Sequence, residues 1–139
     1  MVLLLLLIPS LLALASVSGE VAGDIVFSSD SISLASNNPT EGDDLGMTIT
    51  LTNNATVEAS GVQISLHPDS TANAAFHSET VVVPASGFLQ VGATWLNVPF
   101  GTHLVVLQVT HSSETASVNR SFTASGLADL VVTSLQISP

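Results

Sequence analysis

The chain contains no cysteine among its 139 residues. Disulfide bonds are therefore excluded, and a folded domain has to rest on its own apolar core. The same absence removes thiol catalysis, iron–sulfur clusters and thiolate zinc sites from the functions to be considered.

Lysine is also absent, and Arg120 is the only lysine or arginine residue against eleven acidic ones. The formal net charge of −10 repels phosphate backbones, so nucleic-acid binding is excluded, and anionic membrane surfaces are disfavoured. Charged residues make up only 9% of the chain and hydrophobic residues 46%. This balance predicts a folded core rather than charge-driven disorder.

The N-terminal segment, Met1 to Val17, is rich in leucine and carries no charged side chain. It is short for a bilayer span, which needs about 20 apolar residues, and Ala13-Leu14-Ala15 resembles the cleavage site of a secretory signal peptide. No lysine or arginine precedes the leucines, which departs from an ordinary signal peptide. We assign residues 1–20 to a signal peptide or hydrophobic anchor, with a pilin-like assembly helix as a further alternative. All three place the rest of the chain outside the cytoplasm.

From Asp24 onward, apolar residues recur with a period of two, which is the spacing of β-strands. The clearest runs are 45–51, 62–66 and 89–95, and turn-forming residues separate the runs. Seven such strands can be counted, and no segment forms an amphipathic helix. The pattern predicts an all-β, seven-stranded, immunoglobulin-like Greek-key β-sandwich, preceded by an apolar helical segment.

Two residues stand out within these predicted strands. Trp95, the only tryptophan, has the parity of the inward-facing residues of its strand, so we expect it to anchor the core. Arg120 shares parity with Val118 and Phe122, which points it toward the core as well. An edge strand, a bulge or an outward lean of its long side chain would resolve that conflict.

The end of the chain repeats its beginning. The segments 24–33 (DIVFSSDSIS) and 129–138 (DLVVTSLQIS) are identical at five of ten positions, at an offset of 105 residues. A period of this size corresponds to one sandwich domain. We therefore assign residues 126–139 to a linker and the first strand of a second, truncated repeat.

Several short motifs, in their order and spacing, resemble the CARDB family, the cell-adhesion-related domain of bacterial and archaeal surface proteins. The motifs are Asp24-Ile25-Val26, Asn38-Pro39-Thr40-Glu41-Gly42-Asp43, Ile49-Thr50-Leu51-Thr52-Asn53-Asn54, Ala59-Ser60-Gly61-Val62 and Pro99-Phe100-Gly101-Thr102-His103. The resemblance lies within a predicted domain of residues 21–125 and implies an immunoglobulin-like fold, a surface role, tandem copies and no catalytic residues. The stretch 111–114 departs from the family, which often has an acidic, asparagine-rich tail at this place. The resemblance therefore implies none of the ion or partner contacts of that tail for this chain.

The four histidines do not form a metal motif. His103 and His111 lie eight residues apart on one predicted strand, about 27 Å at strand rise, which is too far to share an ion. His67 and His77 flank a loop and could approach each other, but no acidic third ligand has a suitable spacing. We interpret all four as surface histidines.

Glu41, Asp43 and Asp44 place three carboxylates in one loop and form a weak calcium candidate. They lack the alternating oxygen-ligand spacing of a dedicated calcium loop, so a turn with solvated carboxylates is the preferred interpretation. No other cofactor is predicted. The G-x-S-x-G motif of a serine nucleophile does not occur, and the chain is not expected to be an enzyme.

Two N-glycosylation sequons are present, Asn54-Ala55-Thr56 and Asn119-Arg120-Ser121. Asn54 follows a predicted strand and is expected to be exposed, which makes it the better acceptor. Asn119 lies inside a predicted strand and is expected to be less accessible.

These observations predict a non-catalytic adhesion or spacer module of a larger extracellular protein, whose partners are other surface proteins or neighbouring repeats. One alternative is a filament subunit, in which the N-terminal segment drives assembly and residues 127–138 add as a strand to an exposed edge of a neighbouring copy. A lesser alternative is a carbohydrate-binding accessory module of a secreted enzyme. For that function Phe76, Phe88 and Phe100 are the only candidates for stacking on sugars.

Overall fold

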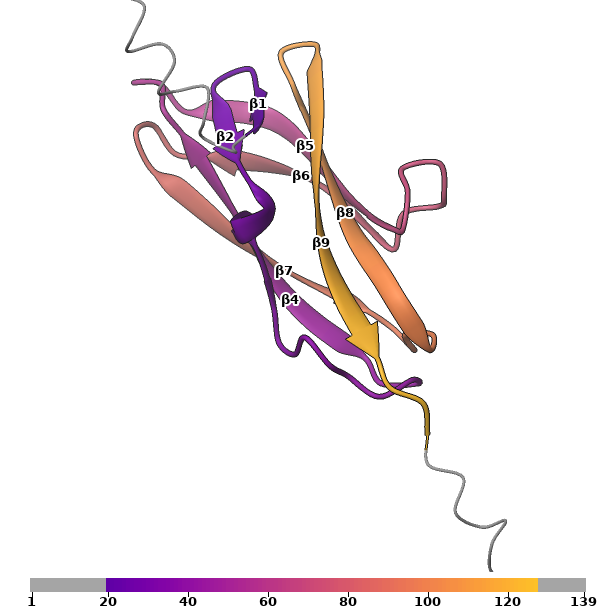
Figure 1. Ribbon diagram of the computed structural model, residues 1–139. Helices are drawn as coiled ribbons and strands as arrows, with labels where there is room; N and C mark the ends of the chain where they lie inside the picture. Colours follow the sequence, from indigo (N-terminus) through magenta and orange to yellow (C-terminus); the bar gives the residue numbers. More distant parts are fainter. Residues whose placement is uncertain (1–19, 128–139) are drawn as a thin grey trace, which may run out of the picture.

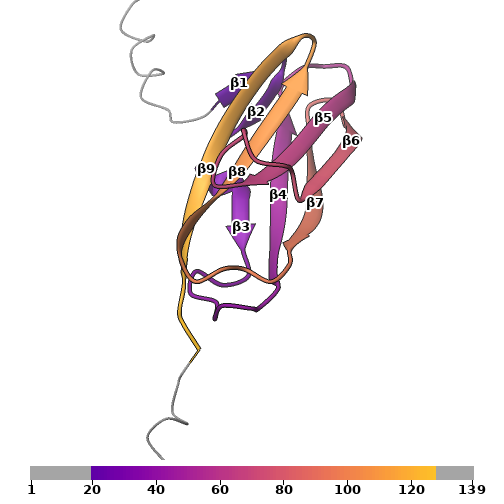
Figure 2. The ribbon, with the colours of Figure 1, turned by 90° about the vertical axis from the view of Figure 1, so that its right-hand side faces the viewer.

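A computed structural model describes residues 20–127, and these residues form two antiparallel sheets packed face to face (Figure 1, Figure 2). The first sheet contains β1 (Glu20–Ala22), β2 (Ile25–Phe27), β3 (Ile32–Leu34), β4 (Leu45–Asn53) and β7 (Phe88–Trp95). The second contains, in spatial order, β6 (His77–Val83), β5 (Ala59–Pro68), β8 (Gly101–His111) and β9 (Glu114–Ala124). The prediction of an all-β sandwich is confirmed.

Strand β4 is the centre of the first sheet. Strand β7 pairs with one edge of β4, from Leu45 opposite Trp95 to Thr52 opposite Phe88, while β2 and β3 pair with the other edge. The chain crosses to the second sheet after β4, returns for β7 and crosses again to β8. These crossings give the Greek-key connectivity of an immunoglobulin-like sandwich.

The core lies between the sheets and follows the predicted alternation. In β4 the residues Leu45, Met47, Ile49 and Leu51 are at most 5% exposed, and the threonines between them face outward. The second sheet contributes inward residues of the same kind, among them Val62, Ile64, Leu66, Val105, Leu107 and Val109. Burial of these apolar side chains is the main force that holds the two sheets together.

The prediction of seven strands is not confirmed, because the described residues form nine. The predicted first strand is divided into β2 and β3 by a short 3-10 helix, η1 (Ser29–Ser31), and β1 precedes it. The Ser28 hydroxyl accepts a hydrogen bond from the Asp30 backbone N–H (3.2 Å), and the Ser31 hydroxyl accepts one from the Ser28 N–H (2.9 Å). These reciprocal bonds form a capping box, so local side-chain chemistry interrupts the strand.

The predicted N-terminal helical segment and the second repeat lie outside the described residues, apart from Glu20, Gly126 and Leu127. Glu20, which the sequence assigned to the N-terminal segment, is the first residue of β1. Between residues 20 and 127, no helix has the length and apolar character that crossing a bilayer requires.

Arg120 joins the two sheets at the open side of the sandwich. It belongs to β9, the edge strand of the second sheet, and its Nη1 donates a hydrogen bond to the Ile32 carbonyl in the first sheet (3.2 Å). The same nitrogen lies 3.6 Å from Asp30 Oδ1, but Asp30 is almost fully exposed, so this ion pair contributes little. The long side chain therefore leans out of the core from an edge strand, and its hydrogen bond connects β9 to β3.

Candidate functional site

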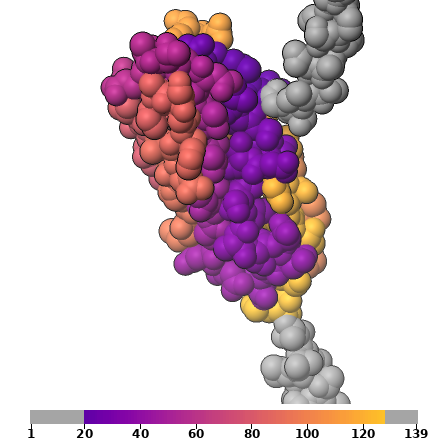
Figure 3. All heavy atoms as spheres, turned by 90° about the vertical axis from the view of Figure 1, so that its left-hand side faces the viewer, coloured from indigo at the N-terminus to yellow at the C-terminus, as the bar shows by residue number. Residues whose placement is uncertain are grey.

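The described chain begins in β1 near one end of the sandwich and leaves from the opposite end (Figure 1). Three segments form that second end, which we call the exit pole: residues 41–44, residues 96–100 and residues 125–127. The space-filling view shows an elongated body, and the described chain leaves it at the lower tip (Figure 3). The exit pole is therefore where any following part of the chain would meet this domain.

Backbone hydrogen bonds fasten the departing chain to the exit pole. Thr40 and Ser125 form a parallel β-bridge, in which the Glu41 N–H donates to the Ser125 carbonyl (2.8 Å) and the Ser125 N–H donates to the Pro39 carbonyl (2.9 Å). The 39–44 loop is bonded in turn to Val98, which accepts from the Gly42 N–H (2.8 Å). Because three segments share these bonds, the exit direction of the chain is set by the fold.

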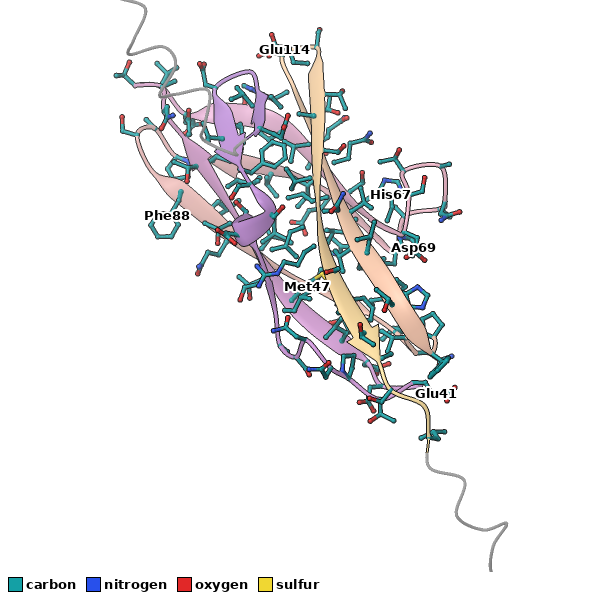
Figure 4. The ribbon with its side chains drawn as sticks, in the orientation of Figure 1. Glu41, Met47, His67, Asp69, Phe88 and Glu114 are labelled. Carbon is teal, nitrogen blue, oxygen red and sulfur yellow. The ribbon has the colours of Figure 1, made fainter. Side chains whose placement is uncertain are left out.

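The three carboxylates of the predicted calcium loop each accept a hydrogen bond from a backbone N–H. The bonds are Asp43 Oδ2 with Thr40 (2.9 Å), Asp44 Oδ1 with Asn97 (2.9 Å) and Glu41 Oε1 with Leu127 (3.0 Å). Figure 4 shows Glu41 beside the exit of the chain. Within the described part of the chain, no three histidine, aspartate or glutamate side chains gather as a group that could hold a metal ion. The hydrogen bonds of these carboxylates therefore hold the loops of the exit pole together.

The exit pole also exposes apolar side chains. Leu96, Phe100 and Leu127 are 64–66% exposed. The Phe100 ring lies against Gly126 so closely that a Cβ atom at position 126 would come within 3.3 Å of it. Phe100 and Leu127 lie beside the Glu41 carboxylate, and exposed apolar side chains bordered by polar groups are typical of a contact surface.

Trp95 lies in the core next to the exit pole and is 7% exposed. Its ring is stacked on Phe76 at a centroid distance of 5.2 Å, and it meets the edge of Phe122 at 5.3 Å. His103 contacts the same cluster, 5.9 Å from both Trp95 and Phe122. The aromatic cluster therefore bridges the two sheets beneath the loops of the exit pole.

His103 has a hydrogen-bond acceptor at each ring nitrogen. Its Nδ1 lies 3.0 Å from Asp69 Oδ2, and its Nε2 lies 3.0 Å from the Phe100 carbonyl oxygen. Both nitrogens can donate only in the imidazolium form. Burial disfavours the charge, but the hydrogen bonds to Phe100 and Asp69 and the attraction of the Asp69 carboxylate favour it more strongly. The pKa of His103 is therefore raised above its usual value of 6.5.

The raised pKa of His103 predicts a pH dependence of stability. Below the unfolded-state pKa of about 6.5 the imidazolium contributes fully to the free energy of unfolding, and this contribution is lost as the pH rises through the raised folded-state pKa. Urea unfolding at intervals between pH 6 and pH 9 should show this loss. The Asp69→Asn variant, which keeps an acceptor for the Leu104 N–H but removes the charge, should lose less stability over the same range. Parallel pH profiles for the two proteins would contradict the assignment.

The other histidines lie apart from the exit pole. His111 is at the opposite end of β8 from His103, and His77 Nε2 is bonded to Glu79 Oε1 (2.7 Å). His67 Nδ1 lies 2.7 Å from the Asn73 carbonyl oxygen and its Nε2 lies 2.9 Å from the Ser65 hydroxyl. A serine next to an oriented histidine supplies the nucleophile and the base of a catalytic triad. This pair sits on the outer face of a sheet, where water solvates any developing charge, and it ties β5 to the loop that follows.

The three candidate phenylalanines are not brought together. Phe76 is packed on Trp95 at the core, whereas Phe88 begins β7 and Phe100 follows its far end. Phe88 and Phe100 are about equally exposed, at 60% and 64%. They cannot form a single platform for a sugar chain.

Both sequon asparagines are exposed. Asn54 lies directly after β4, as expected. Asn119 lies within β9, opposite Val106, and its side chain is exposed as well, because it points away from the core on an edge strand.

The sequence analysis did not single out Asn53 or Asp69 for the hydrogen bonds that their side chains make. Asn53 is 1% exposed and is the only buried polar residue in the described chain. Asp69 has a positive φ of 67° and binds both His103 and the Leu104 N–H. The Pro68-Asp69 pair signals a turn, but no local signal points to its partner 34 residues away.

The sequence matches no protein-family profile and no curated protein. Solved structures do resemble it. The CARDB domain of a Pyrococcus furiosus protein, in its solution structure, has a TM-score of 0.56 at 7% identity, over 73% of this chain and 94% of that one. The crystal structure of that domain in complex with di-metal ions gives 0.56 at 6% identity, over 70% and 93%.

Two further solved structures share the fold. A Geobacter metallireducens protein has a TM-score of 0.58 at 16% identity, over 72% of this chain and 96% of that one. Part of a Paenibacillus cycloisomaltooligosaccharide glucanotransferase complexed with cycloisomaltoheptaose gives 0.50 at 14% identity, over 71% of this chain and 14% of that one. Identities this low show a common fold only. At that level the predicted resemblance to CARDB domains is confirmed.

Proposed function

We propose that the chain is a non-catalytic module of a larger extracellular protein, in which it acts as an adhesion or spacer domain next to further copies of itself. The CARDB-like fold supports a surface-protein module. The observation that carries the spacer role is the course of the chain, which begins at one end of an elongated sandwich and leaves, firmly bonded, from the other (Figure 1).

The tandem arrangement is supported by the internal repeat. The copy of residues 24–33 starts at residue 129, five residues after β9 ends at Ala124. A linker this short would force the next sandwich against the exit pole. The exposed side chains of Leu96, Phe100 and Leu127 would then become covered by that neighbour. A stack of such domains reaches outward in one direction, which is what a spacer requires.

A filament held by strand donation is a second candidate, and the edge of β7 favours it. Among the described strands β7 pairs only with β4, so its outer edge has unpaired backbone groups. None of its eight residues is charged or a proline, so the edge lacks the usual protection against pairing with another chain. In this arrangement residues 127–138 of one copy would extend the sheet of the next.

Intact-mass measurement and N-terminal sequencing of the protein from its native surface or medium would separate these proposals. For a tandem module we expect a mature start between Ser16 and Val21 and a mass far above the 14.2 kDa of these 139 residues. A mass near 14.2 kDa that keeps the leucine-rich segment, recovered in high-molecular-weight material, would favour the filament instead. Recovery only from the cytoplasm would overturn both.

A further inference from the structure

The sequon at Asn54 is held in a fixed, outward-facing loop by the neighbouring residue. Asn53 lies in the core, where its Oδ1 accepts from the Ala55 N–H (2.9 Å) and its Nδ2 donates to the carbonyls of Val57 (2.9 Å) and Val83 (3.3 Å). Asn54 and Thr56 are both exposed. In the part of the chain that the structure describes, neither of their side chains is engaged in a hydrogen bond. The amide and the hydroxyl that define the sequon are thus presented to solvent.

An exposed aromatic ring lies beside this acceptor. Phe88, the first residue of β7, is directly opposite Thr52 of β4, and both face outward. Asn54 is two residues beyond Thr52 and directly follows the end of β4, next to the start of β7 at Phe88. Figure 4 shows the Phe88 ring projecting away from the sheet.

Asn54 and Phe88 line the same open hollow, which has a volume of about 530 Å³. Its remaining lining consists of small polar or backbone-exposing residues: Thr50, Thr52, Asn53, Ser86 and Gly87. A pyranose ring has one face of C–H groups, which packs on an aromatic ring, and hydroxyl groups at its edge, which bond to hydroxyls and backbone groups. The hollow offers both kinds of contact around a single acceptor.

We propose that Asn54 carries an N-linked glycan and that its first sugar packs on Phe88 in this hollow. The donor is an oligosaccharide on a lipid diphosphate. The Asn54 Nδ2 forms a bond to the anomeric carbon of the sugar, the bond from that carbon to the diphosphate oxygen breaks, and the lipid diphosphate leaves with the electron pair. The proton lost from Nδ2 goes to a base of the transferase. The inference rests on the proposed export of the chain, because such transfer takes place outside the cytoplasm.

The second sequon lacks these features. Asn119 is exposed, but its segment is paired with β8 throughout, and the following residue, Arg120, is bonded to the other sheet through Ile32. No phenylalanine faces outward beside it in the register of β8 and β9. A sugar at Asn119 would have no ring to pack on, so Asn119 serves as the comparison site within the same molecule.

The test uses the full chain secreted from a eukaryotic host behind the host's own signal sequence, so that export does not depend on residues 1–19. Glycopeptide mass spectrometry should find a sugar chain on Asn54. After trimming to a single N-acetylglucosamine, in an Asn119→Gln background, Tm should exceed that of the sugar-free chain from a bacterial host by about 2–4 °C. Phe88→Ser should abolish this difference, whereas Phe100→Ser, at an equally exposed ring, should preserve it.

An unmodified Asn54 in the secreted chain would overturn the inference. So would a gain in Tm that is the same with and without Phe88, because the sugar would then act without the ring. Both variants remove exposed rings, and the Tm of each sugar-free form shows directly whether it folds. Native mass and N-terminal sequence test the proposed function separately, since the host's signal sequence replaces the native route of export here.

Discussion

Replacing Trp95 with alanine is expected to lower the free energy of unfolding by about 3–5 kcal/mol. Trp95 is 7% exposed and packs on Phe76, Phe122 and His103, so its removal leaves a cavity between the two sheets. A loss of this size is a large part of the total stability of a small domain, which is about 5–15 kcal/mol, and no disulfide is present to compensate.

The measurement is urea unfolding followed by circular dichroism, because the variant lacks the only tryptophan and its fluorescence cannot report on the transition. Leu96→Ala is the matched control. Leu96 is the next residue in the chain but is 66% exposed, and its variant should change stability by less than about 0.5 kcal/mol. Similar losses for the two variants would show that Trp95 does not anchor the core.

Replacing Asn53 with alanine is expected to cost about 2–3 kcal/mol. The variant leaves the Ala55 N–H and the carbonyls of Val57 and Val83 without their side-chain partner, at a position that is 1% exposed. Of these groups the Val83 carbonyl makes a buried bond, and leaving it unpartnered carries a desolvation penalty that water cannot relieve. The bonds to Ala55 and Val57 are part-buried and add less. The β4–β5 turn and its contact with the end of β6 should loosen together.

Asn54→Ala provides the control for Asn53→Ala, because the two asparagines are adjacent and only Asn54 is exposed. Measured on protein from a bacterial host, Asn54→Ala should stay within about 0.5 kcal/mol of the parent. Hydrogen exchange at the Ala55 amide should accelerate only in the Asn53 variant. If the two variants were equally stable, the three side-chain hydrogen bonds of Asn53 would make no net contribution to the free energy of unfolding.

The alternation of apolar residues was sufficient to predict the strands in the middle of the chain. Leu45 to Leu51 and Leu89 to Trp95 appear in β4 and β7 with the expected faces inward, because burial of one face of a strand is decided by a period of two alone. The segment 24–33 was predicted less well. Its apolar residues suggested one strand, but the hydroxyls of Ser28 and Ser31 compete for the backbone and insert η1.

The hydrogen bonds of the exit pole could not be predicted from the sequence. The three carboxylates of the 41–44 loop were seen as a group and weighed as calcium ligands. Only the Asp43 bond to Thr40 is local, at a separation of three residues. Asp44 reaches Asn97 over 53 positions and Glu41 reaches Leu127 over 86, so their roles depend on which loops the topology brings to the same end.

The sequence by itself determined the class of fold, the inward position of Trp95 and the absence of disulfide and thiol chemistry, because these follow from composition and from a two-residue period. The tertiary structure alone decided the partner of each polar side chain. It put Asp69 beside His103, Arg120 beside Ile32 and Phe88 beside Asn54. Such pairs arise from strand register and from Greek-key crossings, which join distant parts of the chain, and an alternating pattern carries no information about either.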